Sequence, residues 1–136
     1  MGHEPRVALL SYSNFGQPMP QRTQGVRDAV AALDSRNVDF EYDGEMTPAV
    51  ALNPVLMKQA YPFCRLSGPA NVLIMPGLHS ASIASELIQI LGGGEVIGPV
   101  ILGLSKPAQI VPMASTVSGM VNMAALAAYE SATQGS

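Results

Sequence analysis

Cysteine is almost absent from the sequence, since Cys64 is the only one among 136 residues. A single thiol cannot form an internal disulfide or a cysteine-based metal cluster, and it agrees with a reducing compartment. No apolar run approaches the length needed to span a bilayer, and the first residues lack the basic and apolar regions of an export signal. We therefore expect a cytoplasmic protein that does not enter the membrane.

Charged residues are scarce as well: they make up 12% of this chain, against roughly a quarter of an average globular domain. The net charge is −3, and Lys and Arg occur only as isolated residues, so no basic patch can attract nucleic acid or an anionic membrane. This low charge, beside 48% hydrophobic residues, is typical of a surface partly covered by another subunit or domain. We expect a homo-oligomer and no nucleic-acid partner.

The length and the order of apolar patterns predict a single α/β domain over residues 1–136. Strands and helices alternate along the chain, which indicates a mostly parallel sheet with helices on both faces in three layers. The predicted strands are residues 7–10, 38–42, 72–75 and segments within 96–102, and the predicted helices are residues 23–33, 47–60, 83–91 and 116–128. The first strand begins almost at once, as it would in a piece of a longer protein.

Several residues predict where these elements begin and end. Thr23 and Thr47 are suited to cap helices, and Asp43-Gly44 ends the second strand. Pro54 should kink or split its helix because proline removes a hydrogen bond and clashes with the previous turn. The last helix is rich in alanine and methionine with few charges, so most of its surface should be buried.

Candidate ligand residues follow the strands, because an open α/β sheet binds ligands beyond the carboxyl ends of its strands. These loops hold Ser11, Tyr12, Ser13, Asn14, Asp43, Glu45, His79, Ser80, Ser82, Ser105 and Lys106. Ordinary turn and cap chemistry explains such a set equally well. Asp43 and Glu45 are an acid–base candidate, although a solvated turn is favoured, and His79 alone cannot build a metal site or a visible triad. Gly92-Gly93-Gly94 is a helix stop, without the spacing of a phosphate-binding loop.

Five segments together resemble the phosphate acetyltransferase family over nearly the whole chain. They are Leu10-Ser11-Tyr12-Ser13, Asp43-Gly44-Glu45-Met46, residues 68–76 (GPANVLIMP), residues 98–104 (GPVILGL) and Lys106-Pro107. Residues 51–54 (ALNP) and 121–127 (VNMAALA) are more similar to the version fused behind the catalytic domains of large bacterial malic enzymes.

The resemblance implies the second domain of a two-domain fold plus its terminal helix. In that family, acetyl-CoA and phosphate meet between the two domains. Active members usually carry Ser-Arg-Gly after Lys-Pro, where this chain has Pro112, Met113 and Ala114. The Asn-rich loop of the family is replaced by His79 and Ser82, and a usual Gln by Leu102. These replacements remove a cation and hydrogen-bond donors that acyl transfer requires, so no catalytic residue is assigned.

The function that this resemblance implies is a non-catalytic regulatory and oligomerisation domain of a malic enzyme. The parent would convert malate to pyruvate by oxidative decarboxylation with NADP and Mg or Mn, in catalytic domains outside this chain. Acetyl-CoA would be the effector and a second copy the partner. The expected acyl-CoA-binding residues are Ser11, Tyr12, Ser13, His79, Ser80 and Lys106. Two alternatives remain: an active phosphate acetyltransferase fragment and a purely structural dimerisation domain.

Overall fold

A computed structural model describes residues 3–17, 23–93 and 96–134 of the chain. The chain divides into two compact units, Met1–Ser85 and Glu86–Ser136, called the first and the second unit below. The expectation of one domain over residues 1–136 stays a prediction.

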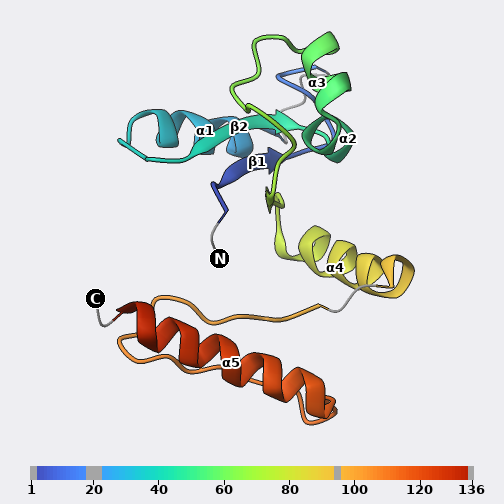
Figure 1. Cartoon of the computed structure of the whole chain (residues 1–136). Helices are drawn as coiled ribbons and strands as arrows, with labels where there is room; N and C mark the ends of the chain where they lie inside the picture. The colour runs from blue at the N-terminus through green and yellow to red at the C-terminus, as the bar shows by residue number, and fades with distance from the viewer. Residues whose placement is uncertain (1–2, 18–22, 94–95, 135–136) are drawn as a thin grey trace. The chain divides into compact units, whose positions relative to one another are not determined.

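The centre of the first unit is a parallel three-stranded sheet in the order β2-β1-β3 (Figure 1). Its strands are β1 (Arg6–Leu10), β2 (Glu41–Met46) and β3 (Val72–Ile74). β1 lies in the middle and pairs in parallel with both neighbours. The predicted α/β fold with a parallel sheet is confirmed.

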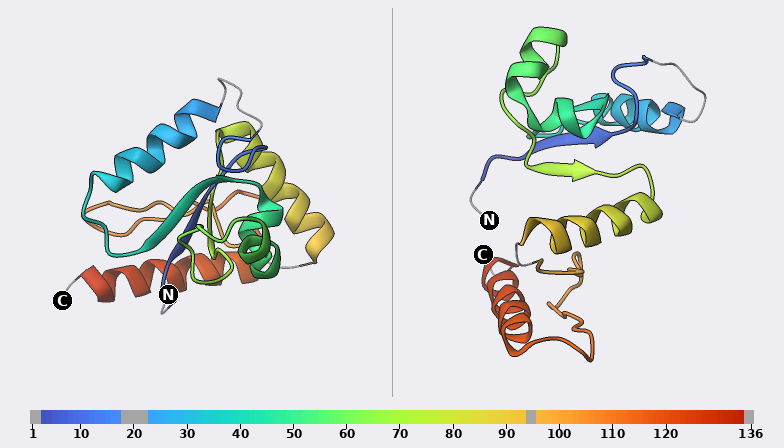
Figure 2. Two further views of the ribbon diagram at one scale, coloured as in Figure 1. Left: turned by 90° about the horizontal axis from the view of Figure 1, so that it is seen from above. Right: turned by 90° about the vertical axis from the view of Figure 1, so that its right-hand side faces the viewer.

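Helices cover both faces of this sheet (Figure 2). Helix α1 (Gln24–Asp34) lies against the face that carries Val7 and Leu9. The opposite face carries Ala8 and Leu10 and packs on α2 (Pro48–Leu52) and α3 (Pro54–Ala60). Side chains alternate between the two faces of a strand, so one apolar run supplies both layers. The larger buried cluster lies on this second face: Ala8, Leu10, Met46, Val50, Ala51, Met57, Leu66 and Ala70.

Helix α4 (Leu78–Gly92) begins in the first unit and ends in the second, which also contains α5 (Val117–Gln134). Residues 96–102 form no strand, contrary to expectation. On α5, Met123 is buried, but Met120 is 46% and Val121 60% exposed. The expectation that most of this helix is buried is therefore wrong for one chain alone.

Several predicted boundaries moved, each for a local reason. The second strand begins at Glu41 and continues through Asp43-Gly44 to Met46, because β1 offers it a parallel partner along this whole length. The helix at 47–60 is split at Asn53, whose Oδ1 accepts hydrogen bonds from the amides of Val55 (3.1 Å) and Leu56 (3.0 Å). Neither predicted threonine cap makes a side-chain cap bond. α4 ends at Gly92 as expected, while Gly94 lies outside the described residues.

Among the described helices, none combines the length and apolar character that crossing a bilayer demands.

Candidate functional site

Parallel pairing places the carboxyl ends of β1 and β2 side by side. The register shifts by one residue there, so that Leu9 pairs with Gly44 but Leu10 with Met46. Glu45 is the extra residue, as in a β-bulge. Its side chain is fully buried and reaches the loop of residues 11–17, called the serine loop below.

The carboxylate of Glu45 joins this loop to helix α1. Its Oε1 accepts hydrogen bonds from Ser13 Oγ (2.6 Å), the Gly16 amide (3.1 Å) and Arg27 Nη1 (3.2 Å). Burial raises the pKa of Glu45, but bonds from Ser13, Thr23 and Gly16 and the charge of Arg27 outweigh burial, so the pKa lies below its ordinary value. Oε2 has no hydrogen-bond partner among the described residues. The site is therefore an ion pair between a fully buried, ionised carboxylate and an arginine that is partly exposed.

Three further hydrogen bonds hold the serine loop against β2 and the residue after it. The Ser11 amide donates to the Met46 carbonyl (2.9 Å), and the Phe15 amide to the Glu45 carbonyl (2.7 Å). Asn14 Oδ1 accepts from the Thr47 amide (2.7 Å). Because both backbone and side chains are anchored, the loop has a defined conformation.

Asp43, two residues before Glu45, is held by a separate arginine. The Arg65 amide donates to Asp43 Oδ2 (2.7 Å), and the Arg65 side chain also pairs with Asp34. Asp43 is 5% exposed and Glu45 is 0% exposed. The expected solvated turn at these two carboxylates is therefore wrong, because β2 continues through them and buries both.

The structure brings Ser11, Tyr12 and Ser13 together, but with different exposure. The Oγ atoms of Ser11 and Ser13 lie 3.3 Å apart in the interior, whereas Tyr12 is 59% exposed. The hydroxyls of Ser11 and Ser13 belong to the cluster around Glu45. The sequence did not indicate that Glu45 has this role.

The other expected ligand residues lie elsewhere. His79 and Ser80 belong to the first turn of α4 instead of a turn before it, because that helix begins at Leu78. The hydroxyl of Ser80 donates to the Gly77 carbonyl (2.8 Å). Lys106 is exposed at a bend in the second unit. That it serves the same ligand as the serine loop stays a prediction.

A cavity of about 540 Å³ lies within the second unit. It is lined by Gln89, Val96, Ile97, Gly98, Val111, Pro112, Ala114, Ser115, Thr116, Gly119, Asn122 and Met123. No charged side chain occurs among these described residues, although the volume suits a small organic ligand. Nowhere in the described part of the chain do three His, Cys, Asp or Glu side chains gather to hold a metal ion.

Comparison with known proteins places this arrangement in a family. The model of the family described as phosphate acetyl/butaryl transferase matches residues 1–128. The chain belongs to the phosphate acetyl/butaryl transferase family. It is 57% identical over 133 residues to an NADP-dependent malic enzyme of Rhizobium meliloti, covering 98% of this chain but 17% of that enzyme. It is 35% identical to a phosphate acetyltransferase of Treponema pallidum, over 96% of this chain and 40% of that protein.

Solved structures of the family have the same fold. The EutD phosphotransacetylase from Staphylococcus aureus matches with a TM-score of 0.86 at 28% identity, over 96% of this chain and 41% of that one. A phosphotransacetylase from Streptococcus pyogenes matches with a TM-score of 0.87 at 28% identity, over 96% of this chain and 40% of that one. The chain thus spans well under half of the acetyltransferases and about a sixth of the malic enzyme that it matches.

Proposed function

We propose that this chain is the non-catalytic regulatory and oligomerisation domain of a cytoplasmic malic enzyme. The parent oxidatively decarboxylates malate to pyruvate, with NADP and Mg or Mn bound by domains outside this chain. One observation carries the proposal. The chain is 57% identical, over 98% of its length, to an NADP-dependent malic enzyme, and it covers only 17% of that enzyme. A module of this size, attached to an unrelated catalytic part, is suited to regulation and assembly.

The cavity of the second unit supports the absence of acetyl transfer. Transfer from CoA to phosphate brings together an anionic nucleophile and a developing oxyanion, which require preorganised positive charge and donors. The family's usual Ser-Arg-Gly segment is replaced here, and Pro112 and Ala114 line a cavity without a charged side chain. Met113 between them is fully exposed.

Acetyl-CoA is the proposed effector, and the serine loop is the proposed contact in the first unit. The loop follows the carboxyl end of β1, and open α/β folds bind ligands beyond the carboxyl ends of their strands. His79 and Lys106 are exposed and remain candidate ligand contacts. Ser11, Ser13 and Ser80 are candidates for an indirect role, in which they hold their segments in the conformation that binds the ligand.

An active phosphate acetyltransferase is the second candidate, and the similarity to the Treponema pallidum enzyme favours it. Assays of the full-length parent separate the candidates. We expect acetyl-CoA to inhibit malate oxidation and expect no acetyl phosphate above a heat-killed control. Acetyl phosphate formation would establish the second candidate. Malate oxidation that does not respond to acetyl-CoA would leave a purely structural dimerisation domain.

Assembly is a separate prediction that rests on α5. Val117, Met120 and Val121 are 77%, 46% and 60% exposed, an apolar surface that a second copy would cover. We expect the parent to sediment as an oligomer at about 10 μM, where a standard-size interface holds, and Met120→Glu to weaken this assembly. Tyr129→Glu is the control, because Tyr129 is 53% exposed and lies on the opposite side of the same helix from Met120. A monomeric parent, or equal effects of the two variants, would contradict an interface at Met120.

A further inference from the structure

Residues 96–102, called the 96–102 segment below, have the composition of a β-strand but no strand beside them. Val96, Ile97, Val100 and Ile101 are β-branched, which strands favour. The segment runs along α5 in the second unit (Figure 1), and the first bend after it lies at Gly103. The sheet in the described part of the chain has the order β2-β1-β3 and does not include it. The segment therefore lacks a partner that its composition favours.

One edge of the 96–102 segment is closed by a side chain. The Ile101 amide donates to Gln109 Oε1 (3.0 Å), and Gln109 Nε2 donates to the Ile101 carbonyl (3.1 Å). Gln109 Nε2 also donates to Glu130 Oε2 on α5 (3.0 Å), which fixes the orientation of the amide. Two residues that face each other in an antiparallel ladder exchange the same pair of hydrogen bonds. Gln109 thus takes the place of a neighbouring strand at Ile101.

The opposite edge of the segment is open. Successive residues of a strand direct their N–H and C=O groups to opposite edges, so those of Val100 and Leu102 point away from Gln109. Within residues 3–17, 23–93 and 96–134, these backbone groups form no hydrogen bond. Leu102 is also 74% exposed. Unpaired backbone groups beside apolar side chains are a template for a further strand.

The two solved phosphotransacetylases indicate where that strand comes from. They match 96% of this chain with TM-scores of 0.86 and 0.87, but the match covers only 41% and 40% of their own chains. More than half of each relative therefore has no counterpart in this chain. A strand in the same polypeptide meets the edge at an effective concentration that can reach roughly millimolar, well above that of a second copy at micromolar concentration.

We infer that the edge of Val100 and Leu102 pairs with a strand of the parent that lies outside this chain. Gln109 is a positioning residue that holds the 96–102 segment extended and closes its other edge. The inference rests on the part of the proposed function that makes this chain a piece of a longer protein, and not on the response to acetyl-CoA. It explains why Ile97 and Leu102 are 52% and 74% exposed in this chain.

Amide hydrogen exchange, resolved by peptide, tests the pairing in the full-length parent and in this chain alone. The peptide of residues 99–104 should exchange on the order of 100-fold more slowly in the parent, because pairing adds hydrogen bonds at Val100 and Leu102. Protection of β1 amides in both samples is the control for folding. If β1 is unprotected in the chain alone, the variants of Leu102 in the parent decide the question.

Leu102→Pro in the parent removes one amide from the open edge. It should speed exchange by about tenfold or more in a segment outside residues 1–136, which is the paired strand, while β1 amides stay unchanged. Leu102→Ala is the control, because it removes most of the side chain but keeps the amide. It should change exchange in that segment by less than about threefold.

Gln109→Leu in the parent tests the positioning role, because it removes both hydrogen bonds to Ile101 and keeps a side chain of similar size. The peptide of residues 99–104 should exchange about tenfold faster, with the middle of α5 unchanged. Gln89→Leu is the matched control. Gln89 lies on α4 in the second unit, and its side chain forms no hydrogen bond within the described residues. It should leave exchange of that peptide unchanged.

Each outcome decides one claim. Equal exchange of the 99–104 peptide in the parent and in the folded chain alone would overturn the pairing. Protection that appears in the chain alone and rises with its concentration would assign the edge to a second copy instead. Equal effects of the two Leu102 variants would exclude backbone pairing, and equal effects of the two glutamine variants would exclude positioning by Gln109. A parent that does not respond to acetyl-CoA leaves these results unaffected, so the proposed regulation fails separately.

Discussion

Replacing Gly44 with alanine should lower the free energy of unfolding by roughly 3 kcal/mol or more. A Cβ at this position would lie 2.6 Å from the Leu9 carbonyl oxygen and 2.9 Å from the Leu9 Cβ. The φ angle of Gly44 is +154°, which side chains rarely adopt. Since β1 and β2 pair through these two residues, relief of the clash requires the strands to separate.

Urea denaturation of the full chain, followed by circular dichroism, measures this effect. Gly25→Ala is the matched control, because nothing lies within 4 Å of a Cβ there and the residue belongs to α1. It should leave stability unchanged or raise it by roughly 0.5–1 kcal/mol, since alanine favours helix. Similar losses in both variants would show that Leu9 does not pack against Gly44 as described.

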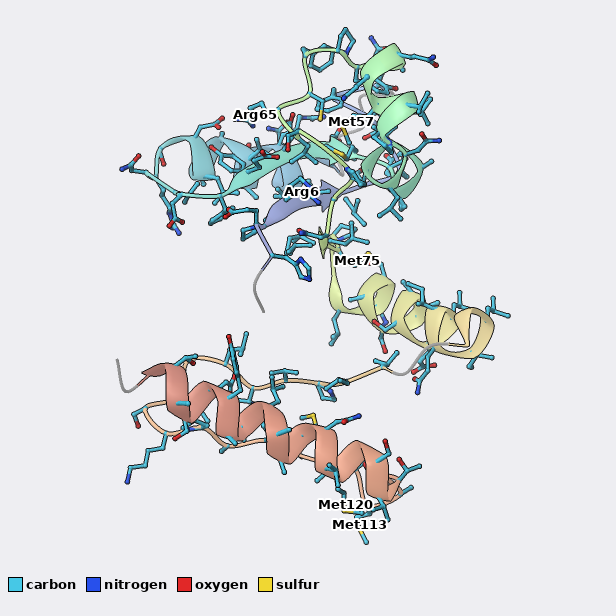
Figure 3. The ribbon with its side chains drawn as sticks, in the orientation of Figure 1. Arg6, Met57, Arg65, Met75, Met113 and Met120 are labelled. Atoms are coloured by element: carbon cyan, nitrogen blue, oxygen red, sulfur yellow. The ribbon has the colours of Figure 1, made fainter. Side chains whose placement is uncertain are left out.

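Met57→Ala should destabilise the chain by about 2–5 kcal/mol. Met57 on α3 is 2% exposed and belongs to the cluster that packs against β1 (Figure 3). Removing its side chain leaves a cavity between α3 and the sheet, and the surrounding structure relaxes into this cavity only in part. The expected loss combines the transfer term of the apolar atoms with the cavity term.

The control is the same substitution at Met113, which is fully exposed. Met113→Ala should change the unfolding free energy by less than about 0.5 kcal/mol, as exposed positions usually do. Equal urea midpoints for Met57→Ala and wild type would contradict the burial of α3 against the sheet.

The strands and helices that the sequence predicted well are those with a clear local signal, such as an apolar run or a proline. The run at residues 7–10 became β1, and Pro54 split its helix in the expected place. The segment at 96–102 has equally apolar residues but forms no strand, since β-pairing needs a partner that the segment itself does not specify. The predicted cap at Thr23 fails because its backbone is already helical (φ −95°, ψ −1°), whereas a capping residue is extended. Its hydroxyl accepts a hydrogen bond from Arg27 Nη1 (3.0 Å).

The sequence predicted the position of the serine loop after β1 but not the burial of its hydroxyls. The rule that ligands bind beyond parallel strands led to Ser11, Tyr12 and Ser13, and the resemblance led to the family that the comparisons show. Neither indicated that the serines face inward. Polar residues in a loop carry no sign of their own exposure, because exposure depends on what packs against the loop.

By itself the sequence determined the α/β class, the parallel sheet and the family, because periodicity and linked motifs are local properties of the chain. Only the tertiary structure decided the role of Glu45. The one-residue register shift between β1 and β2 inserts it as an extra residue, and Arg27 reaches it from a helix 18 positions earlier. A buried charge is tolerated only with such a partner, and that partnership arises when separate segments fold together.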